Sequence, residues 1–200
     1  SKHKFNVINF MKNSLTKIIS AGCALLLHAH AFGQQYHAND LTPAGSSSGK
    51  LTATSGGRQV GTGTAANNYP HAVLLSGNAL AVTDLQPANY YYSMAMCSDD
   101  VQQGGWGYSM AGGIHALVWS GSSASCVDLN PSGYTTSYCL GVHNGEQVGY
   151  ALNQSYFITA SHALCWHGSA ATVVDLHPLG TIYPYSRALG CHDGEEVGYV

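Results

Sequence analysis

Charged side chains are scarce in this chain of 200 residues, of which only 8% are Asp, Glu, Lys or Arg. An ordinary soluble domain has about 25%. Four of the seven basic residues precede residue 18, which leaves only Lys50, Arg58 and Arg187 in the rest of the chain. Nucleic-acid binding needs a cationic surface to neutralise phosphates, so the sequence excludes it. A disordered chain is also excluded, because it would have few aromatic residues and this one has 13 Tyr.

Catalytic and metal-binding motifs are missing as well. The sequence contains no H-E-x-x-H, no G-x-S-x-G, no EF-hand loop and no C-x-x-C pair. GTGTAA at 61–66 fits a dinucleotide-binding G-x-G-x-x-A, but Asn-Asn-Tyr-Pro follows where a helix would have to begin. GSSSGKL at 45–51 is one residue short of a Walker A loop. We therefore predict no catalytic residue, no cofactor and no metal site, and a protein that is not an enzyme.

The N-terminal residues have the pattern of a secretory signal peptide. From Met11 the chain has a basic start, an apolar run over residues 18–27 and Ala29-His30-Ala31 as a cleavage signal. The apolar run is too short to cross a bilayer as a helix. We predict an upstream extension at 1–10, a signal peptide at 11–33 and a β-repeat domain at 34–200. That domain is expected to be secreted or periplasmic and not inserted in a membrane, with a buried N-terminal helix as the alternative for the apolar run.

Removal of residues 1–33 would leave three basic and ten acidic residues, a net charge of −7 with neutral His. This negative charge disfavours binding to an anionic membrane surface. The cysteines that remain would be Cys97, Cys126, Cys139, Cys165 and Cys191. An odd number implies at least one free or intermolecular thiol, and the disulfide pairing stays open. Cys165 takes the place of Val118 in another repeat, and Cys126 that of Val173, so both are predicted to be apolar filler.

What the sequence does have is an internal repeat. HALVWSGSSASCVDLNP at 115–131 and HALCWHGSAATVVDLHP at 162–178 are identical at eleven of seventeen positions, and 71–87 is a weaker third copy. Asp-Leu-x-Pro recurs at intervals of 44, 44 and 47 residues, and each His-Ala lies 13 residues before the following aspartate. The recurring polar residues are Asp40, Asp84, Asp128 and Asp175 with His71, His115 and His162.

Two further segments recur between Asp-Leu-x-Pro and His-Ala. One reads SMAM at 93–96, SYCLGV at 137–142 and SRALGC at 186–191. The other reads RQVGTG, GWGYS, EQVGYA and EEVGYV. Its reference residues lie 20 to 22 residues after the preceding aspartate of Asp-Leu-x-Pro; they are Val60, Trp106, Val148 and Val197. The gap from this segment to His-Ala varies from 9 to 14 residues, which is typical of a surface loop.

Each period thus contains four short strand-like segments separated by Gly, Ser, Asn or Pro. Uninterrupted apolar runs such as ALVW favour a strand covered on both faces, although a buried helical turn has the same pattern. Four strands in 44 to 47 residues indicate a propeller blade. We predict an all-β repeat protein of four-stranded antiparallel blades, a partial β-propeller, with a β-trefoil-like fold as the alternative. Trp119 and Trp166 would pack between blades.

The chain holds about three and a half such repeats, whereas a closed propeller of six or seven blades needs roughly 270–320 residues at this period. We therefore expect it to be truncated at its C-terminus. In series, HAxLW, VDLxP and GxQVGY resemble the motifs of HAF-type extracellular repeats, which occur in secreted bacterial proteins. The resemblance covers residues 38–200, with departures at Val73, Leu75, Leu117, Leu164 and GGWGYS. It implies a secreted, propeller-like repeat domain and no particular activity.

The recurring histidines and aspartates have two interpretations. In WD-type propellers, His, Asp, a hydroxyl and Trp form a hydrogen-bond chain within each blade, and this repeat has the same residue kinds. We therefore predict buried pairs of His115 with Asp128 and of His162 with Asp175. The alternative, one His per blade converging on a central metal, is disfavoured because equivalent residues of different blades usually lie far apart. The remaining repeat-region histidines are expected at the surface: His143, His167, His177 and His192.

These features favour a secreted scaffold or binding module for a protein or a carbohydrate. Ligand contact is expected at the variable connector that contains NQSYFITAS, before His162. A tyrosine has an apolar face and a polar tip, so tyrosines could stack on sugar rings or be ordinary strand residues; the candidates are Tyr90, Tyr91, Tyr92, Tyr183 and Tyr185. The alternative function is a lyase or hydrolase on a propeller scaffold, with its site in a part of the protein beyond this chain.

Overall fold

A computed structural model describes residues 48–77, 81–154, 159–180 and 182–200, all within one unit of the chain, Leu41–Val200. The predicted upstream extension, the signal peptide and Asp40 lie outside the described residues. The described part of the chain contains no α-helix. In particular, no helix there has the length and hydropathy needed to cross a membrane.

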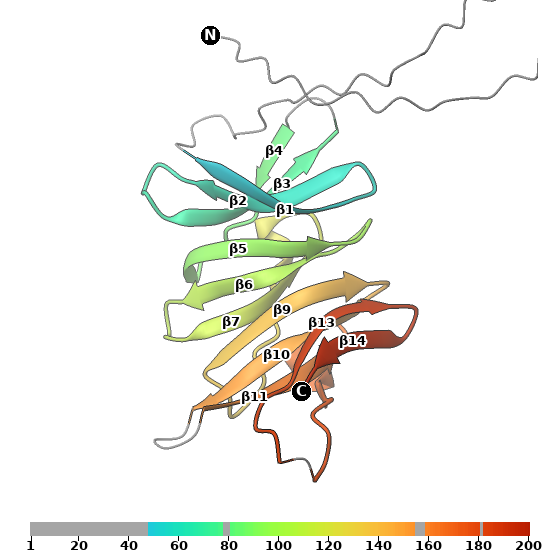
Figure 1. Ribbon diagram of the computed structural model, residues 1–200. Helices are drawn as coiled ribbons and strands as arrows, with labels where there is room; N and C mark the ends of the chain where they lie inside the picture. The colour runs from blue at the N-terminus through green and yellow to red at the C-terminus, as the bar shows by residue number, and fades with distance from the viewer. Residues whose placement is uncertain (1–47, 78–80, 155–158, 181) are drawn as a thin grey trace, which may run out of the picture. The chain divides into compact units, whose positions relative to one another are not determined.

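Three consecutive runs of four strands each pair in sequence order (Figure 1). The first run is β1 (Gly49–Ser55), β2 (Arg58–Thr64), β3 (Pro70–Ser76) and β4 (Ala81–Asp84). The second is β5 (Tyr90–Ser98), β6 (Gln103–Ser109), β7 (Ile114–Trp119) and β8 (Val127–Asp128). The third is β9 (Thr136–His143), β10 (Glu146–Gln154), β11 (Thr159–Trp166) and β12 (Val174–Asp175). A last hairpin consists of β13 (Arg187–His192) and β14 (Glu195–Tyr199).

Every pairing within a run is antiparallel, and one parallel bridge between Ile114 and Thr136 joins the second run to the third. This bridge makes the second and third runs parts of one eight-stranded sheet, and none of the sheets closes on itself. Because the bridge is a single residue pair, we call each run of four strands a sheet. Short 3-10 turns at Ser123–Ser125 and Ala170–Thr172 precede β8 and β12. The all-β prediction is confirmed, and the ALVW run is a strand rather than a helical turn.

Strand β7 has an uninterrupted apolar sequence because other strands pack against both of its faces. Successive side chains of a strand point to opposite faces. Leu117 and Trp119 pack in one core with Val60 of β2. Ala116 and Val118 pack in a second core with residues of β9 to β11. Sequence alternation is absent because neither face of this strand meets water.

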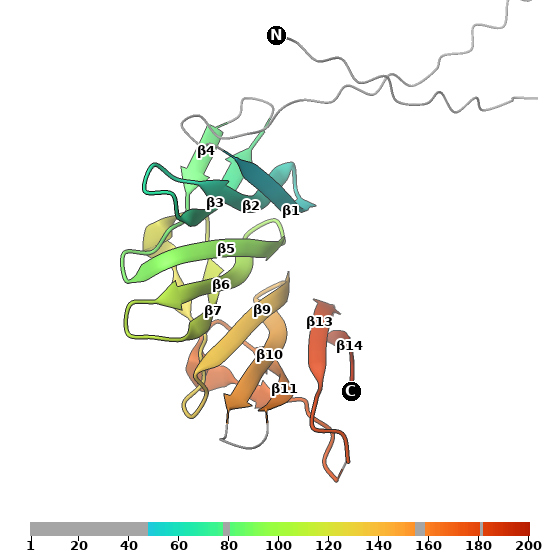
Figure 2. The same ribbon diagram turned by 60° about the vertical axis from the view of Figure 1, so that its left-hand side comes forward.

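Strand β11 repeats this arrangement one run later. Leu164 and Trp166 pack in the core shared with β7, while Ala163 and Cys165 pack with Ala188 of β13. Figure 2 shows the β13–β14 hairpin beside the strands of the third run. Trp166, like Trp119 of β7, has none of its surface exposed. Both tryptophans thus pack between successive runs of strands.

The strand register corrects one sequence alignment. Gly104 pairs with Val118, and Val148 pairs with Cys165, the residue equivalent to Val118. Gly104 rather than Trp106 therefore stands at the valine position of the repeat. The count to Trp106 was wrong by two residues, because GGWGYS shares only its second glycine and an aromatic residue with the QVGY pattern.

Candidate functional site

The predicted His–Asp pairs are present in the structure. Nδ1 of His115 lies 2.7 Å from Oδ2 of Asp128, joining β7 to β8. The same two atoms are 2.7 Å apart in the pair of His162 with Asp175 and 2.8 Å apart in the pair of His71 with Asp84. Each pair therefore ties the third strand of a run to the fourth.

These pairs are less buried than the sequence suggested. The histidine side chains are 15–29% exposed and the aspartate side chains 44–60% exposed. The prediction of buried pairs was wrong, because β4, β8 and β12 are short edge strands that water reaches. An exposed pair contributes less to stability than a buried one.

A buried serine beside each pair connects one sheet to the next. In β9, Oγ of Ser137 accepts the N–H of Ala116 in β7 at 2.9 Å. The same hydroxyl donates to Oδ1 of Asn130 at 2.7 Å. Asn130 is the variable residue of Asp-Leu-x-Pro, and its own N–H donates to Oδ1 of Asp128 at 2.8 Å. The His–Asp pair and the intersheet serine thus belong to one network.

The serine bridge recurs in the other repeats. Ser93 contacts Ala72 and Gln86 at 3.1 and 2.6 Å. Ser186 contacts Ala163 and His177 at 2.9 and 2.7 Å. The bridge was not predicted, because the third position of Asp-Leu-x-Pro changes from repeat to repeat. That position nevertheless carries a hydrogen-bonding side chain in all four copies, and a serine opens the segment that follows the last three: Ser93, Ser137 and Ser186.

Two further expectations about the network need correction. His177 was expected at the surface, but it is half-buried and bonded to Ser186. The indole N–H groups of Trp119 and Trp166 are buried and have no hydrogen-bond partner in the described part of the chain. The tryptophans therefore contribute packing and take no part in a WD-type hydrogen-bond chain.

Cys126 and Cys165 behave as the predicted apolar filler. Cys126 packs against the core that contains Trp119, and Cys165 is buried in the core that contains Ala188. Burial, followed by the charge of Asp128, raises the pKa of Cys126 to about 12. Burial and the nearby glutamates raise the pKa of Cys165 to about 11. Both thiols are therefore protonated at neutral pH and are poor nucleophiles.

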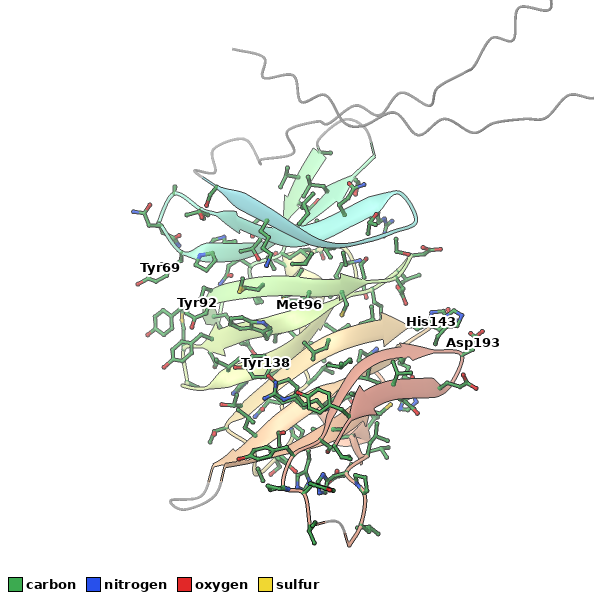
Figure 3. The ribbon with its side chains drawn as sticks, in the orientation of Figure 1. Tyr69, Tyr92, Met96, Tyr138, His143 and Asp193 are labelled. Atoms are coloured by element: carbon green, nitrogen blue, oxygen red, sulfur yellow. The ribbon has the colours of Figure 1, made fainter. Side chains whose placement is uncertain are left out.

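Aromatic side chains make a continuous chain of contacts along the first two strands of successive sheets. Figure 3 labels two of them, Tyr92 on β5 and Tyr138 on β9. We call this set the aromatic band, which consists of Tyr91, Tyr92, Trp106, Tyr108, Tyr138, Tyr150 and Arg187.

The band begins in the second run of strands. The rings of Tyr92 and Tyr108 are stacked, with centroids 5.5 Å apart and planes 9° apart. Trp106 meets Tyr92 edge-on at 6.1 Å and also meets Tyr138 of the next run edge-on at 5.6 Å. Trp106 therefore carries the band from one run of strands to the next.

The band continues in the third run and ends on the last hairpin. Tyr138 and Tyr150 are stacked at 4.9 Å, and the guanidinium carbon of Arg187 lies 4.2 Å from the centroid of Tyr150. Burial raises the pKa of both Tyr138 and Tyr150. Their hydroxyls are thus hydrogen-bond donors as well as acceptors at neutral pH.

The tyrosines singled out in the sequence fall into three groups. Tyr90 is buried, and its hydroxyl donates to Oδ2 of Asp128 at 2.8 Å, so it belongs to the structural network. Tyr91 and Tyr92 belong to the aromatic band. Tyr183 and Tyr185 are exposed in the segment before β13. The central part of the predicted ligand connector, residues 155–158, lies outside the described residues.

A cluster of His143, His192 and Asp193 lies at the turns of two successive hairpins. His143, at the end of β9, has Nε2 3.0 Å from Oδ1 of Asp193, in the β13–β14 turn (Figure 3). Nε2 of His192 lies 3.6 Å from Oδ2 of Asp193. The hydrogen bond to His143, followed by the charge of His192, lowers the pKa of Asp193.

Nitrogen and oxygen donors of this kind suit Zn²⁺, Ni²⁺ or Cu²⁺, and one ligand atom of each residue lies within 4.8 Å of the others. These three residues could hold such an ion, and so could a second set, Glu146, Cys165 and His167. The histidines were expected only to lie at the surface, although H-N-G-E and H-D-G-E mark the same turn in two repeats.

Comparison with protein-family models, with curated proteins and with solved structures gives no match.

Proposed function

We propose that the protein is an exported, non-catalytic recognition module whose repeats are blades of a β-propeller. The equivalence of the three four-strand runs supports the blades, because each run has the same strand order, the same His–Asp pair and the same serine bridge to the following sheet. The resemblance to HAF-type repeats and the signal-like pattern at 11–33 support export.

The ligand that we propose is a neutral glycan bound along the aromatic band. The observation that carries this proposal is the unbroken chain of ring contacts across the second run, the third run and the last hairpin. Tyr91 and Tyr108 are 46% and 37% exposed, so one end of the band is open to solvent. Sugar rings have flat C–H faces that pack on aromatic rings, and tyrosine hydroxyls can bind sugar hydroxyls.

The rigidity of the aromatic band and its low charge also support a neutral glycan as the ligand. The band residues are held by strand pairing and by contact with one another, so little side-chain entropy is lost on binding. Arg187 is the one charged member of the band, and its guanidinium already lies over Tyr150. A strongly acidic polymer would find few cations there.

Affinity electrophoresis through gels that contain a neutral polysaccharide tests the proposal. We expect the wild-type chain to be retarded by at least one of xylan, glucomannan, hydroxyethyl cellulose and mixed-linkage β-glucan. Trp106→Ala should weaken retention about tenfold, equivalent to about 1.4 kcal/mol, because it interrupts the band. Val101→Ala is the control: Val101 is 65% exposed but lies in the β5–β6 turn outside the band.

Equal retention of the wild type and Trp106→Ala would refute the glycan site. If no polysaccharide retards the chain and the aromatic band binds a protein partner instead, the protein-binding alternative is favoured. Release of reducing ends from the polysaccharide would favour the enzyme alternative.

A further inference from the structure

In the described part of the chain, the second strand of one run has a glycine where the QVGY pattern has valine. This residue is Gly104 of β6. A Cβ atom built on Gly104 would lie 2.6 Å from the Sγ atoms of both Cys97 and Cys139. The two sulfurs therefore occupy the space that a side chain would take and are no more than twice that distance apart. The equivalent residues of the other repeats are Val60, Val148 and Val197.

We propose that Cys97 and Cys139 form a disulfide that links β5 to β9, and with them the second run of strands to the third. Both residues contribute to the same core, in which Cys139 is fully buried and Cys97 packs against it. The loss of the valine side chain at Gly104 is what allows the two sulfurs to approach. The proposal rests on export, since structural disulfides persist in oxidising compartments.

The remaining cysteines are placed elsewhere. Cys126 packs against the core between the first and second runs, while Cys165 and Cys191 belong to the core beside β13. Burial and Glu146 raise the pKa of Cys191 to about 12. The five cysteines of residues 34–200 thus divide into one intersheet disulfide and three protonated, packed thiols.

Formation of the bond is a two-electron oxidation. Each thiol loses a proton, the two sulfurs form the S–S bond, and the two electrons reduce a disulfide of the export compartment to two thiols. Hydrogen bonding to Cys139 and burial raise the pKa of Cys97 well above its usual value. Since the thiolate is the attacking species, oxidation should be faster during folding than after the sheets have packed.

Peptide mapping of the chain refolded in oxidised and reduced glutathione tests this pairing. Free thiols are first blocked with iodoacetamide in denaturant, and the chain is then cut before aspartates. This cleavage separates Cys97 (residues 84–98) and Cys126 (100–127) from Cys139 and Cys165, which share 128–174. We expect peptide 84–98 linked to 128–174, and the same link in Cys165→Ser, which identifies Cys139 as the partner.

Matched variants separate the disulfide from general damage to the core. Cys97→Ser and Cys139→Ser should each abolish the link and remove the fall in melting temperature that a reductant causes in the wild type. Cys126→Ser should retain both the link and that fall. A folded wild-type chain in which Cys97 and Cys139 are both free thiols after oxidative refolding, or one in which Cys97 is linked to another cysteine, would overturn the proposal. Neither result bears on glycan retention, which is measured separately.

Discussion

Trp119 and Trp106 lie on neighbouring strands of one sheet, yet they differ in burial and in whether they recur in the next repeat. Trp119 recurs as Trp166 in the next repeat and is completely buried between two sheets. Trp106 is half-buried in the aromatic band, and the register places Tyr150 at its position in the next repeat. One tryptophan is required for packing, while the other belongs to a surface that changes from repeat to repeat.

The same division holds for the two halves of each run. The third and fourth strands carry the parts that recur: the His–Asp pair, the apolar run and the intersheet contact to serine. The first two strands carry the ring contacts, whose residues differ between runs. The repeated residues therefore hold the strands together, and the residues that vary on this scaffold form the surface that we propose for recognition.

Truncation of the two tryptophans gives the largest expected contrast. Trp119→Ala should lower the free energy of unfolding by about 3–5 kcal/mol, because it leaves a cavity between two sheets. Trp106→Ala should cost only about 1 kcal/mol, because part of that ring already meets water. Urea denaturation followed by circular dichroism measures both. Trp119→Phe, which keeps a ring in the cavity, should fall between them, and equal losses for the two alanine variants would contradict the division.

Removal of the serine bridge should have the next largest effect. Ser137→Ala leaves the N–H of Ala116 and Oδ1 of Asn130 without their shared partner in a buried site, at an expected cost of about 1–3 kcal/mol. Ser132→Ala is the matched control, since Ser132 is exposed in the loop before β9. A loss no greater than that of the control, by the same urea denaturation, would show that the bridge does not hold the sheets together.

Much of this scaffold was predictable because the constraint repeats. The strict spacing of 13 residues between His115 and Asp128 fixes their approach across a short hairpin, so sequence alone found the pair. The solvent exposure of the His–Asp pair was not predictable, because it depends on whether another strand covers β8. The serine bridge spans two sheets, and the side chain bonded to the serine hydroxyl changes among Gln, Asn and His, so a search for identical residues does not find it.

The aromatic band was harder to anticipate for a related reason. Tyr92, Trp106 and Tyr138 meet only through strand register and intersheet packing. The run of three tyrosines in the sequence groups the buried Tyr90 with the band residue Tyr92. Strict alternation would put both side chains on one face of β5, but the β5–β6 register shifts between Tyr90 and Tyr92, and this irregularity sends the two side chains to different surroundings.

The His–Asp pair should contribute less than the serine bridge, although it is more regular in sequence. His115→Ala should cost about 0.5–1.5 kcal/mol. The cost is limited because Asp128 keeps the N–H of Asn130 and the hydroxyl of Tyr90 as donors. Thermal or urea unfolding measures it, with Tyr90→Phe combined in a double-mutant cycle. A loss larger than that of Ser137→Ala would mean that the exposed pair, rather than the buried bridge, dominates the network.

The smallest expected effect lies at the turn contact of the last hairpin. The pKa of Asp193 is lower in the folded chain than in the unfolded one, so its contribution is present above the unfolded value, about 3.9, and is lost as the pH falls through the folded value. Asp193→Asn should therefore reduce protection of β13 and β14 from hydrogen exchange slightly at pH 6 and by less at pH 2. Glu195→Gln, at the exposed first residue of β14, is the control. A difference between the Asp193→Asn variant and the wild type that did not depend on pH would show that the side-chain amide, rather than the lost charge, alters the hairpin.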